Sequence, residues 1–257
     1  MLLALDAGNS NITIGAFEET KLIGRWRLRT IHDQTADEWG VLMRNLFALA
    51  SLDIARVDGI IIASVVPTLD APLLAMAQRY FHTTPLFVTP DTDIGLKVLY
   101  DNPREVGADR VVNGVAAFHR YGGPSIVVDL GTTINFDIVS AHAEYLGGMI
   151  CPGIGMSITG LFAKTARLPM VDLREPERLI GKNTVNSIQS GLYYGFAGLI
   201  DGIVGRVVAE LGERATVVAT GGQASLMAGA ARSVQVINED LTLEGLEIIW
   251  RRNNPRK

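Results

Sequence analysis

The sequence is poor in cysteine and in unbalanced charge. Cys151 is the single cysteine among 257 residues, and a lone thiol can form neither an intramolecular disulfide nor a thiolate metal cluster. The 23 Lys and Arg residues nearly balance the 27 Asp and Glu residues, which gives a net charge of −4. This balance leaves no broad basic surface for a phosphate backbone, so we expect no nucleic-acid partner.

Targeting and membrane signals are also scarce. No basic leader precedes the short apolar stretch at residues 1–5, which argues against a signal peptide. We expect no helix long and apolar enough to span a membrane, and therefore a cytoplasmic protein without a membrane partner. Two common nucleotide-binding motifs are missing: there is no G-x-x-x-x-G-K-(S/T), and Gly153-Ile154-Gly155 lacks the third glycine of G-x-G-x-x-G.

What the sequence does have is a hydrophobic content of 48%, enough for a stable core. Alternating and helical apolar patterns predict a mixed α/β chain. The expected strands are 2–5, 12–16, 21–29, 59–66, 86–88, 126–128, 136–139, 145–150 and 216–219, and the expected helices are 35–51, 69–81, 111–118, 155–166 and 187–211.

One turn motif occurs twice. A buried strand leads into Asp6-Ala7-Gly8-Asn9-Ser10, and another leads into Asp129-Leu130-Gly131-Thr132-Thr133, with an offset of 129 − 6 = 123 residues. A repeat at half the chain length indicates a duplicated unit. We expect two domains, 1–120 and 121–257, with a cleft between them and the last helix packing back on the first half.

The repeated turns have the chemistry of a phosphate site. Glycine lets the backbone approach a ligand, and the neighbouring hydroxyl, amide and backbone N–H groups can donate to phosphate oxygens. The Asp6 and Asp129 carboxylates would repel phosphate unless a cation lies between them, so the pair predicts a metal–nucleotide complex. The alternative is that each turn only closes a hairpin.

Two further motifs are ambiguous by themselves. Asp109, in Gly107-Ala108-Asp109-Arg110, could cap the helix that follows, or it could accept the proton of a substrate hydroxyl while Arg110 holds an anionic group. Thr220-Gly221-Gly222 could lie against a base or ribose, or could simply lead into a helix.

Taken together, these motifs resemble the type III pantothenate kinase family. The resemblance also rests on Tyr145-Leu146-Gly147-Gly148, Pro152-Gly153, Leu168-Pro169 and Gly181-Lys182-Asn183-Thr184. It implies an α/β chain of two ribonuclease-H-like halves in the actin/Hsp70/sugar-kinase fold, with an interdomain cleft. It also implies ATP-dependent phosphorylation of the pantothenate hydroxyl, the first step of coenzyme A biosynthesis.

The resemblance further implies a set of site residues. Asp109 would be the proton acceptor, Asp6 would face Mg²⁺, and Asp129 would bind a monovalent cation, K⁺ or NH₄⁺. Thr184 would reach the substrate across a homodimer interface. The ATP-binding positions would be Asp6, Ala7, Gly8, Asn9, Ser10, Asn11, Ile12, Thr13 and Thr132, and the pantothenate-binding positions Tyr100, Gly107, Ala108, Asp109, Arg110 and Thr184.

One departure from the family pattern lies in the second turn. The family usually continues Gly-Thr-Ala-Thr-Thr, whereas here Thr132 is followed by Thr133-Ile134-Asn135, so Ile134 removes a hydroxyl. Two alternatives stay open at this point: a kinase of the same fold that acts on another small hydroxy compound, or a non-catalytic accessory factor for transcription.

Overall fold

The computed structural model describes residues 1–165 and 168–255. The chain forms two units. Unit 1 comprises residues 1–116 together with the C-terminal segment from Leu241 onward, and unit 2 comprises residues 117–240. The boundary lies within helix α3 (Ala108–Tyr121).

Unit 1 is built on a mixed sheet whose strand order is β3-β2-β1-β4-β5. Strands β1, β2 and β3 are antiparallel neighbours, whereas β4 and β5 run parallel to β1. The strands are β1 (Leu2–Ala7), β2 (Asn11–Glu18), β3 (Lys21–Arg29), β4 (Gly59–Ser64) and β5 (Leu86–Phe87). The hairpin and the buried fourth strand that the apolar pattern predicts are therefore present.

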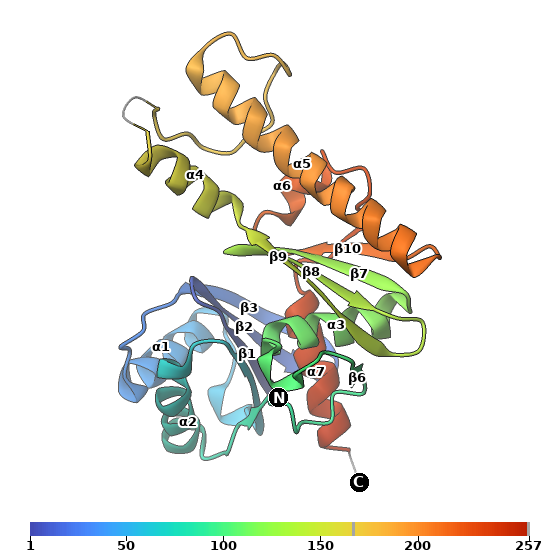
Figure 1. Cartoon of the computed structure of the whole chain (residues 1–257). Helices are drawn as coiled ribbons and strands as arrows, with labels where there is room; N and C mark the ends of the chain where they lie inside the picture. Colours follow the sequence, from blue (N-terminus) through green and yellow to red (C-terminus); the bar gives the residue numbers. More distant parts are fainter. Residues whose placement is uncertain (166–167, 256–257) are drawn as a thin grey trace. The chain divides into compact units, whose positions relative to one another are not determined.

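Helices cover both faces of this sheet (Figure 1). Helix α1 (Ala36–Leu49) begins at a capping box formed by Thr35 and Glu38 and packs with α2 (Pro67–Phe81) over Ile60 and Ile62 of β4. The alternate residues of the sheet face helix α7 (Leu241–Asn253), where Trp250 lies against Gly59. The last helix of the chain thus completes the core of unit 1.

Unit 2 repeats this topology. Its strands lie in the order β9-β8-β7-β10-β11, with two antiparallel pairs followed by two parallel pairs, as in unit 1. The strands are β7 (Ser125–Leu130), β8 (Thr133–Val139), β9 (Glu144–Pro152), β10 (Thr216–Thr220) and β11 (Val236–Ile237). The duplication inferred from the two turn motifs is confirmed by this matching strand order.

The helices of unit 2 gather on one side of its sheet. They are α4 (Ile154–Ala163), α5 (Thr184–Leu211) and α6 (Ala224–Ala228) (Figure 1). Tyr193, Phe196 and Ile200 of α5 pack on the apolar side chains of β7, β8 and β10. The expected helix 155–166 ends earlier, and its last residue, Ala166, lies outside the described residues.

Three expectations need correction. The fifth helix begins at Thr184 rather than at residue 187, because the Asn183 side chain accepts a hydrogen bond from the Asn186 backbone and starts it there. Helix α3 begins at Ala108, so Asp109 lies in its first turn and is not the capping residue. Helix α5 is also long and apolar enough by length and composition to cross a membrane, contrary to expectation, although a core helix passes the same test.

Short elements complete the chain. They are the 3₁₀ turns η1 (Ile54–Arg56) and η2 (Pro103–Glu105) and the two-residue strand β6 (Lys97–Val98). After turn η2, Val106 and Gly107 lead into α3, whose second residue is Asp109.

Candidate active site

The first acidic turn joins β1 to β2. Asp6 is the penultimate residue of β1, directly opposite Thr13 of β2 and Ala63 of β4. The backbone N–H of Gly8 donates to the carbonyl of Asn11 at 3.1 Å, and the Thr30 hydroxyl donates to the carbonyl of Gly8 at 2.6 Å. These bonds close the turn and tie it to the segment that follows β3.

The side chains of this turn divide into two groups. Asn9 and Ser10 are exposed, and Asp6 and Thr13 are half-buried, so all four can reach a ligand. Ala7 and Ile12 are buried and belong to the core of unit 1. At these two predicted ATP positions, only the backbone is available for binding.

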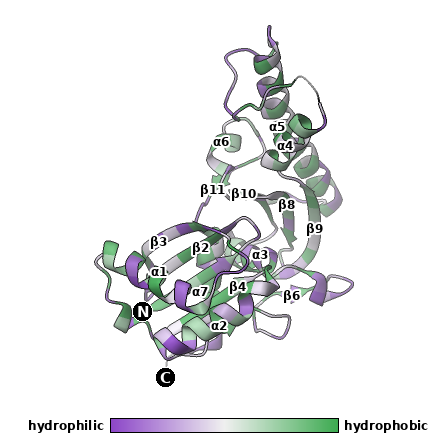
Figure 2. Ribbon diagram, turned by 90° about the vertical axis from the view of Figure 1, so that its left-hand side faces the viewer, coloured by the Kyte–Doolittle hydropathy of each residue, from purple (hydrophilic) through white to green (hydrophobic). Residues whose placement is uncertain are grey.

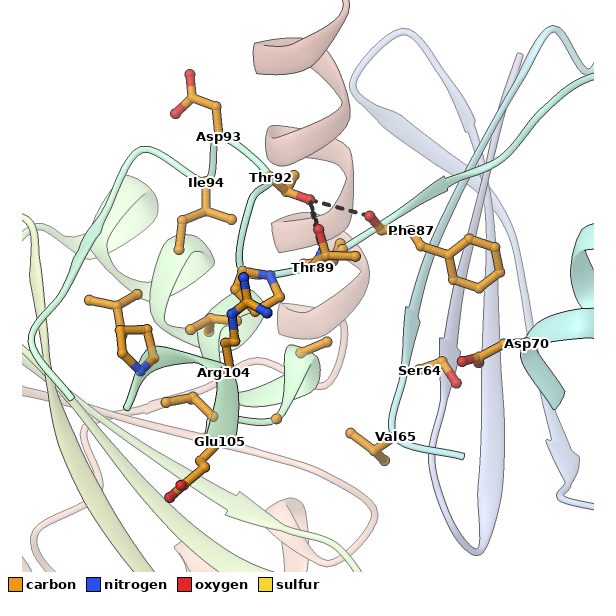
Figure 3. Close-up of a pocket in the computed structure, with 18 of the residues that line it drawn as sticks. Ser64, Val65, Asp70, Phe87, Thr89, Thr92, Asp93, Ile94, Arg104 and Glu105 are labelled. Atoms are coloured by element: carbon orange, nitrogen blue, oxygen red, sulfur yellow. Dashed lines mark hydrogen bonds between the residues drawn. The ribbon is translucent and has the colours of Figure 1, made fainter. Parts of the chain in front are cut away.

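Unit 1 also has a cavity of about 990 Å³, and Figure 3 shows side chains that line it. It lies where β4 and β5 end and α3 begins, and its wall includes Ser64, Val65, Thr89 and Gly107. The backbone N–H of Val65 donates to the carbonyl of Ala7 at 3.1 Å, which places the cavity next to the Asp6 turn. The carboxyl ends of parallel strands are the usual ligand-binding edge of an α/β sheet.

Asp109 lies next to this cavity. Gly107 and Ala108 line the cavity, and Asp109 follows them in the first turn of α3. Burial raises the pKa of the Asp109 carboxyl, an effect that the Arg110 backbone N–H, donating to its Oδ1 at 2.9 Å, and the Arg110 charge partly oppose. A carboxyl with a raised pKa beside a cavity has the properties of a proton acceptor.

The second acidic turn, in unit 2, joins β7 to β8. Asp129 is the penultimate residue of β7 and is paired in register with Asn135 of β8 and Thr220 of β10. The Gly131 backbone N–H donates to the carbonyl of Thr133 at 3.0 Å and closes the turn. The pairing reproduces that of Asp6 in unit 1.

Two neighbouring glycines pack against this turn. Gly221 has φ +89°, and a methyl group on it would lie 2.5 Å from Asp129 Oδ1. Gly153 meets the carbonyl oxygen of Thr132 so closely that no side chain fits. The segment after β10 and the start of α4 therefore both abut the Asp129–Thr132 turn, which makes Thr220-Gly221-Gly222 more than a route into the next helix.

The departure from the family pattern at Ile134 has a structural explanation. Ile134 is fully buried and packs in the core of unit 2, together with Phe136 and Ile138. The side chains that alternate with it, Thr133 and Asn135, face the other side of the sheet, where Asp129 lies. The lost hydroxyl is thus on the core side of β8.

The other predicted site residues are dispersed. Arg110 is buried, Tyr100 lies between β6 and η2 and is not among the described residues that line the cavity, and Thr184 is exposed at the first position of α5. Asp129 and Thr184 belong to unit 2, whereas Asp109 belongs to unit 1. Their convergence on one substrate remains a prediction.

The Asp6 and Asp129 turns suit cations that are coordinated partly by the protein and partly by a bound nucleotide. No group of three or more His, Cys, Asp or Glu side chains in the described part of the chain could hold a metal by itself. Mg²⁺, however, keeps several waters and commonly binds one or two carboxylates together with substrate phosphates. The half-buried Asp6 carboxylate therefore fits Mg²⁺ that arrives with a nucleotide, and the Asp129 carboxylate fits a second cation.

Sequence reasoning missed several residues of the cavity. Ser64, Thr89 and Arg104 line it, and Arg104 extends toward Thr89 (Figure 3). The Thr92 hydroxyl donates to the Phe87 carbonyl at 3.2 Å and shapes the loop after β5. The position of Ser64 at the end of a buried parallel strand was the available signal.

Comparison with known proteins decides the family. A sequence model of the type III pantothenate kinases matches residues 2–206. The chain belongs to the type III pantothenate kinase family. The type III pantothenate kinase of Solibacter usitatus (strain Ellin6076) is 65% identical over 255 residues, covering 99% of this chain and 98% of that protein. The enzyme of Koribacter versatilis (strain Ellin345) is 52% identical, covering 100% and 98%.

Solved structures share the fold of this type III pantothenate kinase chain. An inorganic polyphosphate/ATP-glucomannokinase from an Arthrobacter species has a TM-score of 0.50 at 13% identity, with 98% of both chains covered. A Campylobacter jejuni protein named after the Baf family of transcriptional activators has a TM-score of 0.62 at 20% identity, with 98% of both chains covered. At these identities the likeness concerns the fold alone, which is the expected actin/sugar-kinase type.

Proposed function

We propose that the chain transfers the γ-phosphoryl group of ATP to the hydroxyl group of pantothenate, the first step of coenzyme A biosynthesis, with Asp109 as the proton acceptor. Family membership supports the reaction. The observation that supports the role of Asp109 is its position at the start of α3, beside a cavity that also adjoins the Asp6 turn.

The proposed reaction is a direct in-line transfer. Pantothenate lies in the cavity, and its hydroxyl oxygen attacks the γ-phosphorus while the bond from that phosphorus to the β–γ bridging oxygen breaks. The hydroxyl proton passes to the Asp109 carboxylate, and ADP leaves with the bridging oxygen. Phosphoryl transfer depends more on alignment than on base strength, so the main task of Asp109 is to orient the hydroxyl.

The chain's own groups bind the nucleotide. Backbone N–H groups and the side chains of Asn9, Ser10 and Thr13 donate to phosphate oxygens on one side, and Thr132 donates on the other. Asp6 would hold Mg²⁺, and Asp129 would hold K⁺ or NH₄⁺. When bound, these cations neutralise the charge that develops on the transferred group.

A homodimer is proposed from the surface of unit 2. Met156, Leu161 and Phe162 of α4 and Val185 of α5 are exposed apolar side chains, although the same helices carry a buried face. Apolar residues, coloured green, recur along the ribbons of α4 and α5 (Figure 2). Such a surface is typical of a protein interface. Sedimentation velocity should give a dimer for the wild type and a monomer for Phe162→Lys, and a monomeric wild type would refute this part of the proposal.

The proposed reaction is tested by acceptor-dependent ATP turnover. Purified protein with Mg²⁺ and K⁺ should form ADP and phosphopantothenate in equal amounts, and a panel of other small alcohols should give little ADP. Asp109→Asn should reduce kcat by about 10²–10⁴-fold, because the amide cannot accept the proton.

Asp33→Asn is the matched control, because Asp33 is exposed in the segment between β3 and α1. It should leave kcat unchanged. If another alcohol is phosphorylated faster than pantothenate, pantothenate is not the main substrate. If Asp109→Asn turns over at nearly the wild-type rate, Asp109 is not the proton acceptor. The proposal includes a cytoplasmic location, where ATP is available.

A further inference from the structure

The two acidic turns have equivalent partners across their hairpins. In unit 1, Asp6 on β1 is paired in register with Thr13 on β2. In unit 2, Asp129 on β7 is paired in the same way with Asn135 on β8. Side chains that are opposite each other on neighbouring strands share a face and lie about 5 Å apart at Cβ. Asn135 is therefore the counterpart of Thr13.

The Asn135 side chain is buried. Its exposed fraction is 8%, and that of Thr220, on the other side of Asp129, is 2%. A buried amide needs hydrogen-bond partners, since an unmade bond is costly. The Thr133 hydroxyl donates to Asn135 Oδ1 at 3.0 Å.

The other polar atom of the Asn135 amide is its nitrogen, Nδ2. No hydrogen bond from Asn135 Nδ2 is found among the described residues. Because Thr133 occupies Oδ1, the two N–H groups of Nδ2 remain available on the face that carries Asp129. A carboxylate flanked by an amide donor suits a ligand in which anionic oxygens lie next to a cation.

We propose that Asn135 is a phosphate-binding residue, whose Nδ2 donates to an oxygen of the ATP phosphate chain beside the cation held by Asp129. This inference rests on the proposed function, because it takes the nucleotide to be the ligand of the second turn. Asn135 thereby supplies, on β8, the kind of donor that Thr13 supplies on β2.

The test compares the binding of phosphorylated and unphosphorylated ligands. The dissociation constants of adenosine and of a non-hydrolysable ATP analogue are measured by titration calorimetry with Mg²⁺ and saturating K⁺. Asn135→Asp keeps the shape of the side chain but replaces the N–H donor with a negatively charged oxygen. The dissociation constant of the ATP analogue should therefore rise about tenfold or more, and that of adenosine should stay unchanged. Asn135→Thr replaces the amide donor with a hydroxyl donor, as at Thr13, and should bind the analogue nearly as well as the wild type.

Two further variants make the result interpretable. Asn135→Ala removes the donor without adding charge and should raise the dissociation constant of the ATP analogue severalfold. This variant still tests the proposal if Asn135→Asp fails to fold. Asn254→Asp is the charge control, because Asn254 is exposed after α7 in unit 1. It should bind both ligands as the wild type does.

Three results would overturn the assignment. Unchanged analogue affinity in Asn135→Asp and Asn135→Ala would show that no donor acts there. Equal losses for adenosine and analogue would indicate that Asn135 shapes the whole site. A lower K⁺ requirement in Asn135→Asp, with the affinity at saturating K⁺ unchanged, would make Oδ1 a cation ligand instead. Because these measurements need no acceptor, failure of the proposed reaction is detected separately, as missing pantothenate turnover.

Discussion

Replacing Gly221 with alanine tests whether the segment after β10 supports the Asp129 turn. Gly221 has φ +89°, and a methyl group there would lie 2.7 Å from the carbonyl carbon and 2.8 Å from the nitrogen of Leu130. These are backbone atoms and cannot rotate away. The same methyl group would lie 2.5 Å from Asp129 Oδ1, so the carboxylate must move.

The loss of folding stability caused by Gly221→Ala has two parts. An L-residue in the left-handed region costs about 1–2 kcal/mol. The contacts with Leu130 are about 0.7–0.8 Å shorter than an ordinary contact distance of about 3.5 Å, and overpacking of this kind costs about 1–3 kcal/mol more. Gly212→Ala isolates the first part, because Gly212 has φ +71° at the end of α5 and nothing lies within 4 Å of the added methyl group.

Two assays separate these effects. In thermal unfolding, Gly221→Ala should melt about 2–12 °C below Gly212→Ala, because each kcal/mol shifts the midpoint by about 2–4 °C at this chain length. In the kinase assay, the K⁺ concentration for half-maximal rate should rise about tenfold or more in Gly221→Ala and stay at the wild-type value in Gly212→Ala. Equal behaviour of the two variants in both assays would refute the claimed contact between Gly221 and the turn.

Three other predictions concern acid, cations and the last helix. Burial raises the pKa of Asp109, so kcat/KM should fall on acidification at a higher pH than for an ordinary aspartate; a profile that is flat down to pH 4 would contradict this. The folded chain holds that proton more tightly than the unfolded chain, so stability from this group is present below the unfolded-state pKa and is lost as pH rises through the folded pKa; Asp109→Asn should therefore melt higher than the wild type at pH 7. Replacing all K⁺ and NH₄⁺ by tetramethylammonium at constant ionic strength should abolish product formation, and persistent turnover would reject the role of Asp129. Leu246→Ala, at a fully buried position of α7, should cost about 2–5 kcal/mol and speed hydrogen exchange in β1 and β4 but not in β7; equal acceleration in all three strands would contradict the assignment of α7 to unit 1.

Local sequence pattern was enough for most of the framework. The alternating apolar residues of β2 and β3 and the continuous apolar run of β4 lie in strands where expected, since burial of one or both faces imposes these periods directly. The repeated Asp-x-Gly turn correctly indicated the duplication, because equivalent turns connect equivalent strands in both sheets.

Features that depend on tertiary packing were not predictable in this way. Strands β5, β6 and β11 have two residues each, too few for any period to appear, and only β5 was expected, because residues 86–88 form an apolar run. Ser64, Thr89 and Arg104 come from three separate segments, and only the folded unit 1 brings them to one cavity. Strand β8 begins at Thr133 rather than at residue 136 as expected, and only this earlier start shows that Ile134 and Asn135 lie on opposite faces of a strand.

A crystal structure of the protein with pantothenate, Mg²⁺, K⁺ and a non-hydrolysable ATP analogue tests the central claim most directly. We predict that the pantothenate hydroxyl oxygen lies about 3 Å from a carboxylate oxygen of Asp109 and in line with the γ-phosphorus, and that the triphosphate contacts the Asp6 and Asp129 turns together. A hydroxyl bound away from Asp109, or a triphosphate that touches only one of the two turns, would contradict it.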